Sequence, residues 1–198
     1  MKLTRILEFY SEVNKLKSTL RYNGYDVAFR ESTADHSWRL ALMCMDLYED
    51  LKIDINIVSA IKIALVHDLC EYKDDTDIDA YDVKAGKISK EQKHLIEDNV
   101  ISNLVIEYGK QYIYDLWLEY ENQESRESKY VKALDKIETT LHMIDRGGEI
   151  INFEHTAVYC DKSVENFKEL KPLLKEVKSK LKEYYNLKGY EWKNEWNM

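Results

Sequence analysis

The sequence places an imidazole directly before a carboxylate at the end of an apolar run. The run is IKIALVHDLCE at 61–71, and the pair is His67 and Asp68. Burying a carboxylate is costly unless a cation or hydrogen bonds compensate its charge. Two more groups lie in helical contexts, His36 within ESTADHSWRLAL and Asp135 within KYVKALDKIET. Together they predict a two-histidine, two-carboxylate site for one divalent ion (Mn, Fe, Co, Ni or Zn), and ligand type does not choose among these metals.

This ligand set indicates hydrolysis of a phosphate ester. A bound ion would lower the pKa of a water molecule and polarise a phosphoryl oxygen. Consecutive helical side chains diverge by roughly 100°, so His67 and Asp68 can share an ion only beside the helix edge, with other helices completing the shell. Glu71 follows His67 by four residues, on the same helical face. It could orient the attacking water or protonate the leaving oxygen.

Each residue also has a plain structural interpretation. A lone histidine such as His36 is more often a hydrogen-bonded structural residue, and Asp68 could be only the polar end of a buried helix. Asp135 fits a solvated charge pattern with its neighbours Lys132, Lys136 and Glu138. Among the remaining histidines, His142 could approach the face of Asp135, whereas His155 is expected in a polar turn.

Composition predicts a helical protein of one domain. The chain has 198 residues, 44% of them apolar and 33% charged, with six glycines and one proline. This balance favours helix almost throughout. The net charge of −8, without a long basic block, argues against nucleic acid as a partner. A small anionic substrate is still compatible, because a metal ion reverses the local potential.

Cysteine usage and hydropathy predict a cytoplasmic protein. The three cysteines are widely spaced and form no CxxC pair, which suits a reducing compartment. No apolar run approaches the roughly 20 residues needed to cross a bilayer. The first ten residues lack the features of a signal peptide.

Hydrophobic periodicity predicts helices joined by loops at 21–30 and 72–88. The expected helices are 2–20, one from a capping box at Ser32 to about Leu51, one capped by Asp54 or Asn56, one from Ser89 to Tyr108, 110–120, one from Ser125 to Gly147, and one or two within 163–186 with Pro172 at a joint. The prediction is a single all-α domain over 1–198, with the metal-site core at about 30–145 and C-terminal helices at about 160–190.

The order H…HD…D resembles the HD-domain phosphohydrolase superfamily, and in particular its 5′-deoxynucleotidase branch. The resemblance lies in RESTADHSWRLALM (30–43), IALVHDLCE (63–71) and LWLEYENQESRESKYVKALDKIE (116–138). It implies a helical bundle that hydrolyses deoxyribonucleoside 5′-monophosphates, with Glu71 and Asp68 in the reaction. The metal ligands that it implies are His36, His67, Asp68 and Asp135.

The resemblance also implies substrate contacts for Arg21 and Tyr22, fifteen and fourteen residues before His36. Members of the family carry an arginine–aromatic pair there, and the arginine fork suits phosphate. From the residues alone, Arg21 could equally satisfy carbonyls at a helix end. The family's Gly-Asp pair after the Glu71 position is missing here, since Thr76 stands at that point. Its role could pass to Asp75 or Asp77, or be lost.

Three other functions stay open at this stage. The same ligands would serve a deoxynucleoside triphosphate triphosphohydrolase with a longer anion pocket. A di-iron oxygen enzyme would need more histidines near the site than this chain offers. A helical interaction module could retain a vestigial metal site without catalysis. Because proteins of this branch are often dimers, the resemblance also predicts a possible homodimer.

Overall fold

The computed structural model describes residues 3–22, 30–73, 82–83, 85–147 and 152–197. Within these ranges the chain is helical and forms no strand, apart from one isolated bridge between Leu20 and Ser32. None of the helices in this part of the chain is long and apolar enough to cross a bilayer. The predicted all-α fold is therefore confirmed.

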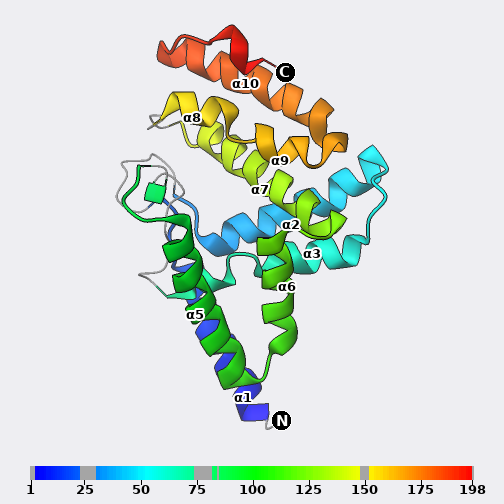
Figure 1. Cartoon of the computed structure of the whole chain (residues 1–198), viewed down its shortest axis with the longest axis vertical. Helices are drawn as coiled ribbons and strands as arrows, with labels where there is room; N and C mark the ends of the chain where they lie inside the picture. The colour runs from blue at the N-terminus through cyan, green and yellow to red at the C-terminus, as the bar shows by residue number, and fades with distance from the viewer. Residues whose placement is uncertain (1–2, 23–29, 74–81, 84, 148–151, 198) are drawn as a thin grey trace.

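The two termini lie at opposite ends of the molecule, and the helices fill the length between them (Figure 1). The α-helices are α1 (Leu3–Val13), α2 (Thr33–Leu51), α3 (Ile57–Val66), α5 (Lys90–Tyr108), α6 (Gln111–Asn122), α7 (Arg126–Asp145), α8 (Phe153–Val158), α9 (Asp161–Glu165) and α10 (Lys171–Lys188). Single 3₁₀ turns are Asn14–Lys17, Leu69–Tyr72, Lys168–Leu170 and Asn194–Trp196.

Local capping explains where the central helices begin. The Ser32 side chain accepts from the backbone of Asp35, whose carboxylate accepts from the Ser32 backbone, so the predicted capping box is confirmed. Asn56, rather than Asp54, caps α3. Ser89 caps α5 as predicted. A capping side chain satisfies backbone N–H groups that have no partner within the helix, and this fixes the first turn.

Two predictions at the ends of the chain were wrong in detail. The first helix does not continue to residue 20, because α1 ends at Val13 and a 3₁₀ turn follows. His155 lies in helix α8 and not in a turn. Pro172 does stand at a joint, as predicted, because it follows the 3₁₀ turn Lys168–Leu170 and lies in the first turn of α10, where its missing N–H costs no intrahelical hydrogen bond.

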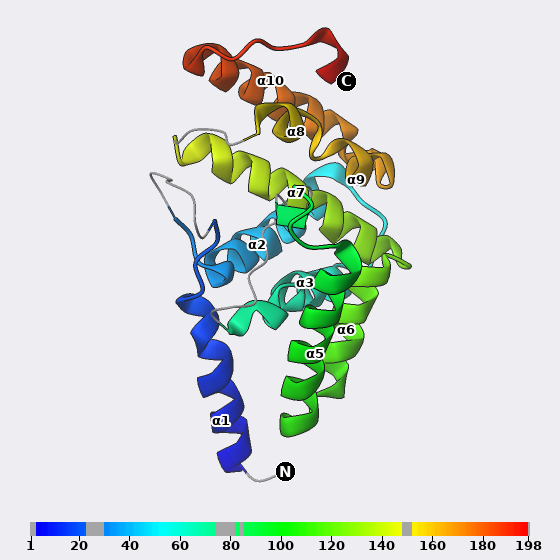
Figure 2. The ribbon, with the colours of Figure 1, turned by 60° about the vertical axis from the view of Figure 1, so that its left-hand side comes forward.

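Helix α7 lies between two layers of helices (Figure 2). On one side it packs against α2 and α3, and on the other against α9 and α10. The largest buried cluster joins these elements through residues that include Leu40, Ile63, Tyr130, Leu134 and Leu174. A second cluster joins α1, α5 and α6 and contains Phe9, Ile101, Leu104 and Trp117. The central helices are therefore held from both sides.

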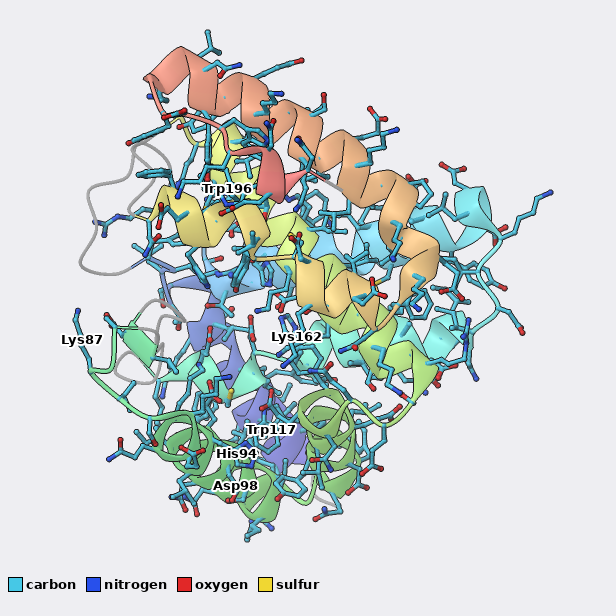
Figure 3. The ribbon with its side chains drawn as sticks, turned by 45° about the horizontal axis from the view of Figure 1, so that its top comes forward. Lys87, His94, Asp98, Trp117, Lys162 and Trp196 are labelled. Carbon is cyan, nitrogen blue, oxygen red and sulfur yellow. The ribbon has the colours of Figure 1, made fainter. Side chains whose placement is uncertain are left out.

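The C-terminal tail docks on the chain's own last helix. Trp196 is 4% exposed and lies against α10 (Figure 3). The buried Lys178 side chain donates to the Trp196 carbonyl at 2.7 Å and to Asp161 at 2.8 Å. Trp192 packs edge-on against Tyr185, with ring centroids 5.4 Å apart. A buried ammonium that is shared by a carboxylate and a carbonyl ties the tail to the helix layer.

Candidate metal centre

The four predicted metal ligands converge from three helices. His36 lies in the first turn of α2, His67 and Asp68 follow α3 directly, and Asp135 lies in the middle of α7. The Nε2 atom of His36 is 3.3 Å from Nε2 of His67, 3.3 Å from Oδ1 of Asp135 and 3.6 Å from Oδ2 of Asp68. His36, His67 and Asp135 are buried. Residues that are far apart in sequence thus present four ligand atoms to one small volume.

The end of α3 explains why the adjacent pair His67 and Asp68 can face the same point. The helix ends at Val66, and Asp68 has φ −104° and ψ 17°, outside helical geometry. This turn brings Oδ2 of Asp68 to 2.9 Å from Nε2 of His67. The divergence expected of consecutive helical side chains is therefore avoided, because only one of the two residues continues the helix.

Both imidazoles are oriented by hydrogen bonds at their outer nitrogens. Nδ1 of His67 lies 2.9 Å from the Ala64 carbonyl, and Nδ1 of His36 bonds to the Glu138 carboxylate. A carbonyl and a carboxylate only accept, so each Nδ1 carries the proton. When the imidazoles are neutral, each Nε2 atom therefore directs its lone pair into the space that the two carboxylates also face. Such a set of acceptors requires a cation between them, as imidazole–metal sites do.

The electrostatics of the cluster also favour a cation. Burial and the Arg21 charge oppose protonation of His36, yet hydrogen bonds to Asp135 and Glu138 outweigh both and raise its pKa to about 9. Burial favours the neutral form of Asp68, but the charges of His67 and His36 hold its pKa below the usual value. In the metal-free protein, a proton on His36 thus supplies the positive charge that a metal ion would otherwise bring. The residues fit a divalent ion with mixed nitrogen and oxygen ligands.

Glu138 was not expected at this site, and the interpretation of it as part of a solvated surface was wrong. Its side chain is fully buried; one carboxylate oxygen bonds to His36, and the other accepts from Arg39 Nε at 2.6 Å. Glu138 follows Asp135 by three residues, on the same face of α7. That spacing could have indicated a carboxylate behind the histidine.

Asp135 is also buried, at 4% exposure, so its interpretation as a solvated residue does not hold. The Tyr120 hydroxyl donates to its Oδ2 atom at 2.7 Å, and Lys136 Nζ lies 3.1 Å from the same atom. Lys132 Nζ lies 4.0 Å from the centre of the Tyr120 ring. Sequence patterns gave no signal for Tyr120, because its hydroxyl reaches Asp135 from a different helix.

Glu71 lies beside the four ligands, in the 3₁₀ turn that follows them. Its backbone N–H donates to the Asp68 carbonyl at 3.0 Å, and its carboxylate accepts from the Thr33 hydroxyl at 3.0 Å. Thr33 is the first residue of α2, one turn before His36. Glu71 is buried at 7% exposure and lines the same cavity as Asp68. The turn is tighter than the helical one that the sequence predicted, but the carboxylate is still directed at the site.

Arg21 and Tyr22 line this cavity too. Arg21 lies 3.2 Å from Glu31 and donates to the Thr139 hydroxyl at 3.2 Å. Tyr22 has a positive φ of 63°, and its ring stacks on His142 with centroids 5.6 Å apart. His142 therefore approaches the neighbourhood of the site, but it supports Tyr22 and is not one of the converging ligands. The other two proposed substrate residues, Asp75 and Asp77, lie outside the described residues, as does Thr76.

The cavity has a volume of about 190 Å³ and opens between the end of α3 and helices α5, α6 and α7. Its far wall includes Trp117, on which the half-buried His94 stacks at 5.5 Å (Figure 3). Among the described residues, four cationic side chains line it, namely Arg21, Lys93, Lys132 and Lys136, together with the carboxylates of Asp68, Glu71, Glu97, Glu121 and Asp135. A cavity with cations beside a metal-type ligand cluster is suited to a small anionic molecule.

The known proteins that this chain resembles include 5′-deoxynucleotidases and a predicted metal-dependent phosphohydrolase. The 5′-deoxynucleotidase HDDC2 of Dictyostelium discoideum is 39% identical over 151 residues, which cover 70% of this chain and 76% of that protein. Human 5′-deoxynucleotidase HDDC2 is 35% identical over 155 residues, covering 76% of this chain and 70% of that protein. A solved structure from Magnetospirillum magnetotacticum MS-1, described as a predicted metal-dependent phosphohydrolase, has a TM-score of 0.73 and 25% identity, covering 95% of this chain and 97% of that one.

The match to the family itself spans both layers of the molecule. A model of the HD domain matches residues 13–183, which include all four converging residues, His36, His67, Asp68 and Asp135. The match reaches from the last residue of α1 into α10, so it covers most of the chain. This chain belongs to the HD domain family.

Proposed function

We propose that this protein is a metal-dependent 5′-deoxynucleotidase, which hydrolyses deoxyribonucleoside 5′-monophosphates to deoxynucleoside and phosphate. One observation carries the proposal: the two imidazole Nε2 atoms lie 3.3 Å apart, with two carboxylates facing the same point. The relatives that are named 5′-deoxynucleotidases support the choice of substrate class. We assign the metal ligands to His36, His67, Asp68 and Asp135.

The chemistry requires a nucleophile, a proton carrier and a counter-charge for the phosphate. A divalent ion in this site would lower the pKa of water toward neutrality and polarise a phosphoryl oxygen. Glu71 would hold or transfer the proton, either accepting it from the attacking water or returning it to the leaving 5′ oxygen. The Thr33 hydroxyl donates to one Glu71 oxygen at 3.0 Å, which helps to hold the carboxylate at the cavity that it lines.

Arg21 would contact the phosphate from the edge of the cavity. Glu31 and Thr139 hold its guanidinium in place, so little conformational entropy is lost when an anion binds. Tyr22 would present its ring to the nucleoside, supported from behind by His142. Asp75 or Asp77 as a further substrate contact stays a prediction from the family resemblance.

The direct test is turnover with defined metals. Protein stripped by a chelator would be reloaded separately with Mn²⁺, Co²⁺, Fe²⁺, Ni²⁺ or Zn²⁺ and incubated with deoxynucleoside monophosphates, ribonucleoside monophosphates and deoxynucleoside triphosphates. We expect orthophosphate from the deoxynucleoside monophosphates. Release of triphosphate instead would favour the triphosphohydrolase. No product with any of the metals would contradict the proposal.

Two ligand variants separate an enzyme from a non-catalytic helical module. His67→Ala and Asp68→Ala, made separately, should each lower metal content and abolish phosphate release. Unchanged metal content and activity in both variants would remove the catalytic interpretation. We further expect a cytoplasmic protein that forms a homodimer, to be checked by cell fractionation and by sedimentation of the purified chain.

A further inference from the structure

The cavity beside the converging ligands contains four cationic side chains, and these differ in how they are held. Three of them have a carboxylate partner at close range. These pairs are Arg21 with Glu31, Lys93 with Glu97, and Lys136 with Asp135. Each of these three cations therefore already has part of its donor capacity engaged by a carboxylate. Lys132 is the fourth, and its surroundings differ.

Lys132 has no hydrogen bond to any of the residues that the structure describes. Its nearest carboxylate oxygen, on Glu121, is 4.0 Å from Nζ, which is beyond hydrogen-bonding distance. Its ammonium lies 4.0 Å from the centre of the Tyr120 ring. The side chain is only 21% exposed. An ammonium carries three donors, so Lys132 brings to the cavity donor capacity that none of the described residues uses.

The position of Lys132 relates it to the candidate metal site through one aromatic ring. The Tyr120 ring lies under the ammonium, and the Tyr120 hydroxyl donates to Asp135 at 2.7 Å. Lys132 and Lys136 lie one turn apart on α7, so they share a face of that helix. Burial and the neighbouring Lys136 charge lower the pKa of Lys132. Both ammonium groups line the cavity, and of the two only Lys136 lies within hydrogen-bonding distance of a described carboxylate.

We infer that Lys132 binds the phosphate group of the substrate, as a second cationic contact beside Arg21. This inference rests on the proposed function, since it names a further residue for the same site. A phosphate monoester brings up to two negative charges into the cavity. Lys136 is matched by Asp135 and Arg21 by Glu31, so Lys132 supplies charge that is not already balanced at close range. The cation–π contact with Tyr120 holds the ammonium in place before the anion arrives.

The test compares Lys132→Gln and Lys132→Arg with a control, Lys129→Gln. Lys129 lies on the same helix but does not line the cavity. For Lys132→Gln we expect KM for a deoxynucleoside monophosphate to rise about 10- to 100-fold, with kcat within about threefold, because a charge-assisted contact made equally to substrate and transition state is lost. Competitive inhibition by inorganic phosphate should weaken by a similar factor. Lys132→Arg should keep most of the binding, and Lys129→Gln should match the wild type.

Two further measurements keep the result decisive. Metal content and melting temperature should stay unchanged in Lys132→Gln. If Lys132→Gln does not fold, Lys132→Met takes its place in the test, because its apolar side chain preserves the contact with the Tyr120 ring. Unchanged KM and unchanged phosphate inhibition, or a loss of kcat alone, would overturn the inference. Binding of inorganic phosphate to the Mn²⁺-loaded protein, measured by calorimetry, tests the role of Lys132 independently of turnover. A wild type that hydrolyses no deoxynucleotide would count against the proposed function only, and not against phosphate binding by Lys132.

Discussion

Replacing Glu138 by Gln should weaken metal binding without removing a proposed ligand. The Glu138 carboxylate bonds to Nδ1 of His36 and accepts from Nε of Arg39 at 2.6 Å. A glutamine has one accepting oxygen and one donating nitrogen. Whichever way the amide is placed, its NH₂ group must face a donor, either His36 or Arg39. The change therefore leaves one of these two donors without its acceptor and removes the negative charge behind the imidazole.

The expected losses of stability and of metal affinity follow from the lost hydrogen bond and the lost charge. An unmatched hydrogen bond to a charged group costs about 1.5–3 kcal/mol, and Arg39 is 28% exposed, so water compensates part of its loss. For a chain of this size, about 2 kcal/mol corresponds to a fall in melting temperature of roughly 4–8 °C. Loss of an orienting hydrogen bond behind a histidine ligand typically lowers metal affinity about 10- to 100-fold. Metal titration in a chelator buffer and thermal unfolding of the metal-free protein measure the two effects.

Asp145→Asn is the matched control, because Asp145 contacts the same arginine. Its carboxylate lies 3.3 Å from an Arg39 nitrogen but is 66% exposed. Exposed ion pairs contribute little, so its unfolding free energy should change by less than about 0.5 kcal/mol and its metal affinity should be that of the wild type. Equal melting temperatures and equal metal affinities for the two variants would refute the orienting role of Glu138.

Three other predictions concern the proton carrier, the metal and the tail. Glu71→Gln should retain its metal and lower kcat about 100- to 10,000-fold, checked by elemental analysis and phosphate release. In the metal-free protein the raised His36 pKa stabilises the fold fully below 6.5 and ceases to do so as pH rises through about 9, so melting temperature should fall across that window. Saturating metal should abolish this fall, and metal affinity should rise over the same range because the competing proton is lost. Lys178→Met removes the bonds to Asp161 and the Trp196 carbonyl, so proteolysis should cut the tail faster while metal content stays constant.

Local signals predicted the helix starts because a cap depends on residues only a few positions apart. Ser32 and Asp35 form their capping box within a single turn, and Asn56 and Ser125 each bond to the backbone three residues on. The family pattern indicated the converging ligands for a related reason. Each is a residue type that is costly to bury alone, so several of them in apolar contexts indicate a shared cation.

The residues behind the ligands could not be predicted from the same patterns. Charged residues on a helix usually mark a solvated face, and Glu138 stands among charged neighbours. Helix α7, however, packs against α2 and α3 on one side and α9 and α10 on the other, so it has little solvated face. The charged side chains in the middle of the helix must then find partners inside the protein, whereas those at its ends, such as Arg126 and Asp145, stay exposed. Which of them would meet His36 or Tyr120 depends on tertiary contacts that no local pattern contains.

The HD dipeptide works as a ligand pair because the helix ends there. If α3 continued through Asp68, the two side chains would point roughly 100° apart and could not approach one ion from the same side. The chain instead leaves helical geometry at Asp68, and its carboxylate turns back to 2.9 Å from His67 Nε2. Glu71 then sits in the next turn, facing the same cavity. One helix terminus thus positions two proposed ligands and the proposed proton carrier, so a change that lengthened α3 by one turn would displace all three together.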